Sequence, residues 1–292
     1  MKKKFYSLLA MTLALLLGLS GCIEPEEVPT EDPSNGDDVE INEDLHVYQN
    51  TVYVYSTAVN ESLLTTDLSP AYLILANKVS ALGSDYVPAG LTVIEDQLLT
   101  SGDRGNGLQL DRTALQALAA IINEMAADGV PDIGVTSAYR SYSYQNSLFE
   151  KYKTIEMSTI TTDARAFFGD EYIYNHYTSL GKNALSYDDA VQVVLSYSAA
   201  PGTSEHQTGL CVDFVTEEYG DRLDLSFENT KAFEWLQENA YKFGFILRYP
   251  KDKVAVTGYS YEPWHYRFVG REAATDIHFS GLSLEEYLNS LG

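Results

Sequence analysis

The chain has 292 residues, of which 45% are hydrophobic and 21% charged, a composition typical of globular proteins and unlike that of disordered or fibrous ones. It carries 19 Lys and Arg against 42 Asp and Glu, so its formal net charge is −23. This acidity argues against binding to nucleic acid and against electrostatic attraction to an anionic membrane surface. The chain contains two cysteines, too few for a disulfide scaffold.

The N-terminus has the pattern of a secretory signal. Lysines at positions 2–4 precede an apolar run from Leu8 to Leu19, which is too short for a comfortable membrane span. The sequence Leu19-Ser20-Gly21-Cys22 resembles a bacterial lipobox, in which the cysteine becomes the lipidated first residue. An ordinary signal peptide followed by a chance cysteine is the alternative. We expect residues 1–21 to be a lipoprotein signal peptide and Cys22 to anchor the protein on the outer face of the bacterial cytoplasmic membrane.

An acidic segment follows the cysteine. Residues 23–44 contain ten Asp or Glu, no Lys or Arg, and three prolines. High charge with low hydrophobicity cannot offset the entropy lost on ordering, and like charges extend a chain. We therefore expect residues 22–50 to form the lipidated cysteine and a disordered tether. Without an internal repeat or a second break in composition, residues 51–292 are expected to be one folded domain, and the protein a monomer.

Hydrophobic periodicity predicts a mixture of helices and short strands in that domain. Apolar residues at helical spacing predict helices over 111–127, 146–152, 188–197, 230–243 and 272–279. Alternating or short apolar runs predict strands at 133–135, 209–215, 245–249 and 264–269. Because the elements follow no regular βαβ rhythm, we predict an α+β fold in which helices flank a small, mainly antiparallel sheet.

Two of the five histidines lie in patterns that suit a metal site. His206 lies in a glycine-containing turn, seven residues before Asp213 on a predicted strand, so both side chains could meet at one strand mouth. Glu262 lies three residues before His265. A uniformly extended stretch would point these two to opposite faces, but Pro263 favours a bend that reunites them. Either pair alone occurs more often in a structural role.

Three motifs in order give a stronger signal. They are Ser137-Ala138-Tyr139-Arg140-Ser141, then Ser204-x-His206-x-x-Gly209-x-x-x-Asp213, then Glu262-Pro263-Trp264-His265. This set resembles the VanY-type zinc D-alanyl-D-alanine carboxypeptidase family, which includes L,D-carboxypeptidase relatives. The resemblance runs from about Tyr72 to Leu288. It implies a zinc site at the sheet and a serine-independent metallo-carboxypeptidase that trims peptidoglycan stem peptides.

The resemblance also implies a role for individual residues. His206, Asp213 and His265 match the ligands of one Zn²⁺ per chain, which leaves an open position for water. Glu262 matches the general base that takes a proton from this water and delivers it to the leaving amine. Arg140 matches the residue that stabilises charge on the scissile carbonyl.

Three further positions lie in or beside these motifs. Gln145 and Ser204 match positions that contact the peptide in such enzymes, although Ser204 suits a turn or cap residue equally well. The family usually has alanine where this chain has Cys211. Because Cys211 lies two residues before Asp213 on a predicted strand, the two side chains are expected to share a face, so Cys211 is either an additional thiolate ligand or a small packing residue.

The resemblance leaves several functions open. Removal of the terminal D-Ala from a stem ending in D-Ala-D-Ala is the first choice. Cleavage of D-Ala from a tetrapeptide stem, an L,D bond, is the alternative, and the residues do not decide between them. A non-catalytic, zinc-containing cell-wall-binding module should lack Glu262 or Arg140, whereas this chain has both. An endopeptidase that cuts cross-links would need a cleft open at both ends.

Overall fold

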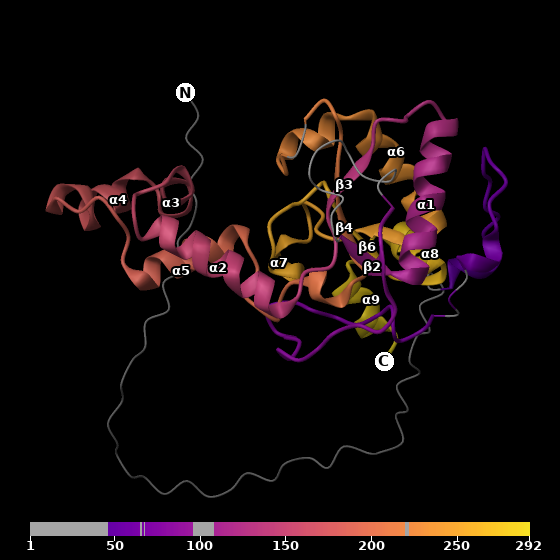
Figure 1. Ribbon diagram of the computed structural model, residues 1–292, viewed down its shortest axis with the longest axis horizontal. Coiled ribbons are helices and arrows are strands. Elements are labelled where there is room, and N and C mark those ends of the chain that lie inside the picture. The colour runs from indigo at the N-terminus through magenta and orange to yellow at the C-terminus, as the bar shows by residue number, and fades with distance from the viewer. Residues whose placement is uncertain (1–45, 65, 67, 96–107, 220–221) are drawn as a thin grey trace, which may run out of the picture. The chain divides into compact units, whose positions relative to one another are not determined.

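Figure 1 shows the computed structural model, which describes residues 46–64, 66, 68–95, 108–219 and 222–292. The predicted signal peptide, Cys22 and the tether up to residue 45 lie outside these described residues. Within the described ranges, no helix combines the length and the apolar character needed to cross a bilayer.

Six short strands form two sheets in the described part of the chain. They are β1 (Leu91–Val93), β2 (Gln109–Asp111), β3 (Gly134–Ser137), β4 (Cys211–Val215), β5 (Phe245–Leu247) and β6 (His265–Phe268). The larger sheet has the order β3-β4-β6-β5, and each neighbouring pair is antiparallel. β1 pairs with β2, also antiparallel. The predicted α+β fold with a small antiparallel sheet is confirmed.

Helices surround the sheets. The α-helices are α1 (Arg112–Ala127), α2 (Tyr142–Glu156), α3 (Thr162–Phe168), α4 (Asp170–His176), α5 (Tyr187–Tyr197), α6 (Lys231–Asn239), α7 (Val254–Thr257), α8 (Arg271–Ser280) and α9 (Leu284–Ser290). Short 3₁₀ helices are η1 (Val47–Asn50), η2 (Glu61–Leu63), η4 (Thr178–Leu180), η5 (Glu205–Thr208), η6 (Leu225–Asn229) and η7 (Ala240–Phe243). The predicted helices correspond to α1, α2, α5, α6 with η7, and α8.

The alternation of side chains along β4 and β6 gives the larger sheet two different faces. One face packs against α1 in the main hydrophobic cluster and contributes Val212, Phe214, Tyr266 and Phe268. The residues between them are Cys211, Asp213, His265 and Arg267, and all four are buried. Strand alternation therefore places a row of chemically active side chains on the face opposite α1.

The helix predicted over 230–243 ends earlier than expected. α6 ends at Asn239, and the last turn tightens into η7 before Gly244. Gly244 has φ 84°, a conformation that favours glycine. A Cβ atom there would lie 2.7 Å from Phe268 Cε2, so the glycine also permits close packing against β6. The chain then enters β5 directly.

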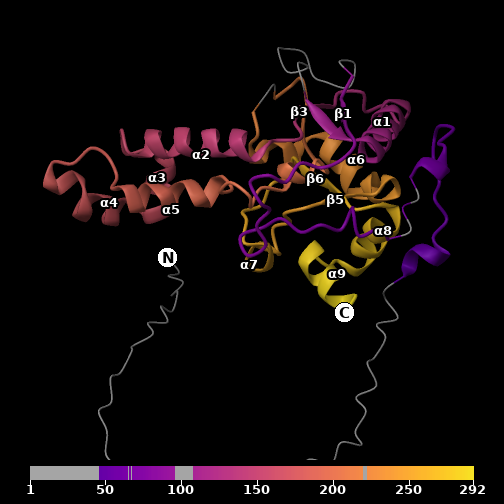
Figure 2. The same cartoon turned by 60° about the horizontal axis from the view of Figure 1, so that its bottom comes forward.

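A helical extension stands beside the sheet. α2 and α5 run side by side in both views, and α3 and α4 lie at the end of this pair that is farther from the sheet (Figures 1 and 2). This extension has a hydrophobic cluster of its own, which includes Ala164, Ile173, Leu185 and Val193. The predicted helix 146–152 is the centre of α2, which begins four residues earlier because Ser141 caps it by accepting a hydrogen bond from the Tyr144 N–H.

The folded part of the chain includes residues expected in the tether. Residues 47–50 form η1, and the Tyr48 backbone N–H donates to Asp276 Oδ1 on α8 at 3.3 Å. Residues 47–50 therefore contact α8, and the boundary at residue 50 stays a prediction.

Candidate active site

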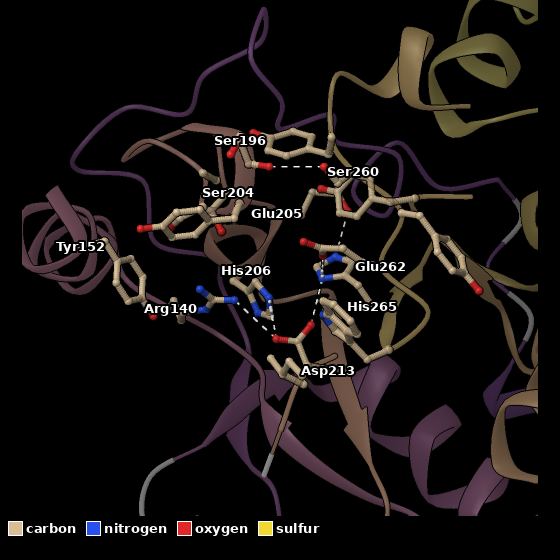
Figure 3. Close-up of a pocket in the computed structure, with 18 of the residues that line it drawn as sticks. Arg140, Tyr152, Ser196, Ser204, Glu205, His206, Asp213, Ser260, Glu262 and His265 are labelled. Carbon is tan, nitrogen blue, oxygen red and sulfur yellow. Dashed lines mark hydrogen bonds and ion pairs between the residues drawn. The ribbon is translucent and has the colours of Figure 1, made fainter. Parts of the chain in front are cut away.

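The register of β4 and β6 brings two of the predicted ligands together. Asp213 and His265 are cross-strand partners, and His265 Nδ1 lies 3.0 Å from Asp213 Oδ1. His206 comes from η5, just before β4, and its Nε2 lies 3.2 Å from Asp213 Oδ2. All three side chains are 97% or more buried. Figure 3 shows them converging on one point at the bottom of a pocket.

A tight turn sets the position of His206. η5 ends at Gly209, which has φ 69° and leads the chain into β4. This conformation favours glycine, and a Cβ atom at Gly209 would also lie 2.8 Å from Leu91 Cδ2 and 3.1 Å from Pro88 Cγ, which would have to shift. His206 Nδ1 lies 2.6 Å from the Ala138 carbonyl oxygen and donates to it. This hydrogen bond leaves Nε2 facing Asp213.

A second turn brings the side chain of Glu262 close to that of His265. The His265 backbone N–H donates to the Glu262 carbonyl at 3.1 Å, which closes a turn through Pro263 and Trp264. Glu262 Oε2 then lies 3.7 Å from His265 Nδ1, and Glu262 lines the same pocket. The bend predicted from Pro263 is confirmed, and it places a carboxylate beside the three candidate ligands.

Arg140 reaches the site from the loop after β3. Its Nη2 lies 3.5 Å from Asp213 Oδ2, and its Nη1 donates to Gln145 Oε1 at 3.1 Å. Gln145 Nε2 donates in turn to the Ala199 carbonyl at 2.7 Å. Gln145 is buried and is absent from the linings of the two hollows at the site, so the structure places its amide next to Arg140, and its contact with the peptide stays a prediction. Ser204 does line the pocket.

Two hollows meet at Arg140. The first has a volume of about 430 Å³ and contains His206, Glu262 and His265 among its lining residues. The second has a volume of about 520 Å³ and extends along α2. Both are lined by Arg140, Tyr152, Asp213 and Leu223. The site thus offers space on both sides of Arg140.

Burial and neighbouring charges set the protonation of the two carboxyl groups. Burial raises the pKa of Asp213, but His206 and His265 lower it more, and the net pKa lies well below the usual value. Burial also raises the pKa of Glu262, and His265 only partly offsets this, so the net pKa is raised. Asp213 is therefore an anionic donor, whereas Glu262 is more basic than an ordinary glutamate.

The residues fit a metal ion. His206 Nε2 is buried and has no hydrogen-bond partner among the described residues, and His265 Nδ1 lies 3.0 Å from Asp213 Oδ1 at the same point. Two imidazoles and one carboxylate form a donor set used by catalytic zinc sites. The three ligands inferred from the sequence are thus brought together in a geometry compatible with that role.

Cys211 lies beside this donor set. His206, Cys211 and His265 each place one potential ligand atom within 4.8 Å of the others. Burial raises the pKa of the Cys211 thiol, but the two histidines lower it more, to about 7. Cys211 is fully buried, lies two residues before Asp213 on β4, and lines neither hollow.

A buried ion network that none of the sequence motifs indicated lies next to the site. Glu205 Oε1 accepts hydrogen bonds from Arg248 Nε and Arg267 Nη1, both at 2.8 Å. Arg248 also makes two hydrogen bonds to Glu285, at 2.6 and 2.9 Å. The sequence offered one signal for this network. Arg267 lies two residues after His265 on a predicted strand, so the two side chains had to lie on the same face of the sheet.

Comparisons with known proteins identify the family of the chain. Residues 107–271 match the family model described as VanY: D-alanyl-D-alanine carboxypeptidase. The chain is 36% identical over 218 residues to the D-alanyl-D-alanine carboxypeptidase of Enterococcus faecalis, an alignment that covers 75% of this chain and 66% of that protein.

Two solved structures share the fold. One is the LdcB LD-carboxypeptidase, with 32% identity, a TM-score of 0.57, and coverage of 76% of this chain and 87% of that chain. The other is a mutant of the D,D-pentapeptidase VanY from a VanB-type resistance cassette in complex with Zn(II), with 34% identity, a TM-score of 0.54, and coverage of 75% and 99%. The chain belongs to the VanY family of D-alanyl-D-alanine carboxypeptidases.

Proposed function

We propose that this chain is a zinc-dependent carboxypeptidase that removes the terminal D-Ala from peptidoglycan stem peptides ending in D-Ala-D-Ala. One observation carries the proposal. Glu262 lies beside the set of His206, Asp213 and His265 and lines the same pocket as Arg140. A site that only bound zinc for structural reasons would need neither a basic carboxylate nor a guanidinium at its mouth.

Each residue has a separate task. His206, Asp213 and His265 would hold one zinc ion, which when bound supplies a Lewis acid and an activated water near neutral pH. The Glu262 carboxylate accepts a proton from the attacking water and returns it to the leaving amine. The Arg140 guanidinium faces the carbonyl oxygen as that oxygen gains negative charge.

The surroundings support the same assignment. Gln145 fixes the Arg140 guanidinium by accepting from Nη1, so the cation is oriented before substrate binds. The two hollows on either side of Arg140 give room for the stem on one side of the scissile bond and the released residue on the other. Tyr152 lines both hollows and offers an aromatic wall for a peptide.

Defined substrates test this proposal. The purified chain is incubated with pentapeptide and tetrapeptide stems, with and without a metal chelator, and the products are identified by mass spectrometry. We expect the pentapeptide to lose one D-Ala and the chelator to stop the loss. Binding of either peptide without any cleavage would replace the enzyme with a binding module.

The second candidate is an L,D-carboxypeptidase that removes D-Ala from tetrapeptide stems. The likeness to the LdcB LD-carboxypeptidase favours it specifically. The same experiment separates the two, because an L,D enzyme shortens the tetrapeptide and leaves the pentapeptide intact.

We also propose that the protein is a lipoprotein on the outer face of the bacterial cytoplasmic membrane. The Leu19-Ser20-Gly21-Cys22 sequence after an apolar run supports this proposal, as does the acidic tether over residues 23–44. A flexible anchor would let the domain reach stem peptides in the cell wall.

A further inference from the structure

Two buried polar atoms behind the site face each other without a hydrogen bond. Glu205 Oε2 and His265 Nε2 lie 3.6 Å apart, and neither has a hydrogen-bond partner among the described residues. Glu205 is 1% exposed and His265 is 3% exposed, so water does not compensate either atom from the surface. An approach of a few tenths of an ångström would satisfy both groups at once.

The other carboxylate oxygen is held firmly. Glu205 Oε1 accepts from Arg248 Nε and from Arg267 Nη1, both at 2.8 Å. Arg267 donates its remaining hydrogen bonds to the backbone carbonyls of Tyr72, Ile74 and Phe268. The two guanidinium groups therefore keep the carboxylate charged and aimed, with Oε2 turned toward His265.

The two histidines of the site are held through opposite nitrogens. His206 donates from Nδ1 to the Ala138 carbonyl and presents Nε2 to Asp213. His265 presents Nδ1 to Asp213, at 3.0 Å, and turns Nε2 toward Glu205. An imidazole can bind a metal only through the nitrogen that carries no proton, so the partner of the other nitrogen decides which tautomer is available.

We propose that Glu205 is the positioning residue of His265: it accepts a hydrogen bond from Nε2–H, keeps the proton on that nitrogen, and leaves the Nδ1 lone pair directed at the metal site. The proposal rests on the assignment of His265 as a metal ligand under the proposed function. Arg248, just after β5, and Arg267 on β6 hold Glu205, and Arg248 is held in turn by Glu285 on α9, so these elements together fix the orientation of this ligand.

A matched pair of variants separates positioning from simple stability. Glu205→Gln removes the charge that faces His265 and keeps the size of the side chain. Glu285→Gln removes a charge from the same network, where Glu285 pairs with Arg248, and Glu285 makes no hydrogen bond or ion pair with His265 among the interactions of the described residues. If the network only stabilises the fold, both variants lower the melting temperature and neither changes zinc binding selectively.

Zinc affinity is measured on the full chain by competition with a chromogenic chelator. Outer partners of ligating histidines typically contribute about 10–100-fold to metal affinity. We expect Glu205→Gln to weaken zinc binding by about that factor and Glu285→Gln to bind zinc close to wild type. Equal zinc affinities of the two variants would overturn the proposal.

A second measurement needs no variant of the network. Long-range ¹H–¹⁵N spectra of the zinc-loaded wild type report which nitrogen of each imidazole carries the proton, and through-bond assignment of the wild type identifies the His265 signals. We expect the His265 proton on Nε2, in a hydrogen bond, and the metal on Nδ1; a proton on Nδ1 would refute the proposal even if Glu205→Gln does not fold. Neither the zinc affinity nor the NMR spectrum depends on turnover. A protein without peptidase activity would therefore contradict the proposed function but would still allow the role of Glu205 to be tested.

Discussion

Asp213 and His265 are register partners on neighbouring antiparallel strands, with His265 Nδ1 3.0 Å from Asp213 Oδ1. Backbone hydrogen bonds of the sheet fix such a pair, so two donors of the site are placed by the strands and not by a loop. His206 is held separately, by the Gly209 turn and the Ala138 carbonyl. The two strands and the turn therefore position the three candidate ligands independently of one another.

The first prediction concerns the metal content. The wild-type chain should hold about one zinc ion, and His206→Ala or His265→Ala should reduce this to a small fraction, because each leaves two of three protein ligands. His176→Ala is the control, since His176 is exposed on α4 and stacks on Tyr172 away from the site. Metal analysis after dialysis measures the effect. Stoichiometric zinc in both ligand variants would show that the assignment is wrong.

Cys211 provides a second prediction. A catalytic zinc site keeps one position open for water, and a fourth protein ligand would close it. Because the proposed reaction needs that position, Cys211 should not bind the metal, although its thiol lies beside both histidines. The cobalt-substituted wild type should then lack the near-ultraviolet charge-transfer absorption of a cobalt–thiolate bond, and Cys211→Ala should leave the spectrum unchanged. A band that disappears in Cys211→Ala would establish a fourth ligand.

The sequence predicted the local features of the site well. The strand 209–215 required Cys211 and Asp213 to share a face, and the structure shows it on β4. The bend at Pro263 was required for Glu262 to rejoin His265, and the backbone hydrogen bond between those residues closes it. Both inferences depend only on short-range geometry, which residue spacing determines.

Long-range relations could not be predicted in the same way. The pairing of Glu205 with Arg248 and Arg267 joins residues 43 and 62 positions apart, and no periodicity specifies it. The short helices α3 and α4 were missed because each has only seven residues, too few for a clear helical pattern. The hydrogen bonds of Gln145 to Arg140 and to the Ala199 carbonyl, 54 positions away, likewise follow from the fold and not from residue spacing.

A third prediction tests the anchor. If Cys22 carries acyl chains, wild-type cells fed a labelled fatty acid should incorporate the label into the protein, and Cys22→Ala should abolish it and release the protein from membranes. Cys211→Ala is the matched control, because this buried cysteine should not be modified. An unlabelled wild type, or a Cys22→Ala protein that stays in the membrane fraction, would contradict the lipoprotein proposal.

A fourth prediction concerns Arg140 and its support. Arg140→Ala should lower kcat by about 10²–10³, the usual effect of losing one stabiliser of a developing negative charge. Gln145→Ala should lower kcat less, because the guanidinium remains but loses the acceptor at 3.1 Å that orients it. When both substitutions are combined, Gln145→Ala should cause almost no further loss of kcat, since the guanidinium that Gln145 orients is already absent. Additive effects on kcat would mean that Gln145 acts independently of Arg140.

The last prediction separates the general base from the metal ligands. Glu262 Oε2 lies 3.7 Å from His265 Nδ1, outside the closer set formed by His206, Asp213 and His265. Glu262→Gln preserves the size of the side chain and its hydrogen bonding but cannot accept the proton. General acid–base catalysis typically contributes about 10²–10⁴-fold, so kcat should fall by about that factor.

Zinc content and peptide affinity distinguish this loss from damage to the site. Both should stay near wild type in Glu262→Gln, because the carboxylate acts along the reaction path and contributes little to the ground state. Asp213→Asn is the comparison, since weakening a ligand should reduce zinc content and turnover together. Measuring turnover, zinc and peptide binding on the same preparations gives the answer. Turnover that survives the Glu262→Gln substitution would remove Glu262 from the mechanism, and zinc loss in that variant would make it a ligand instead.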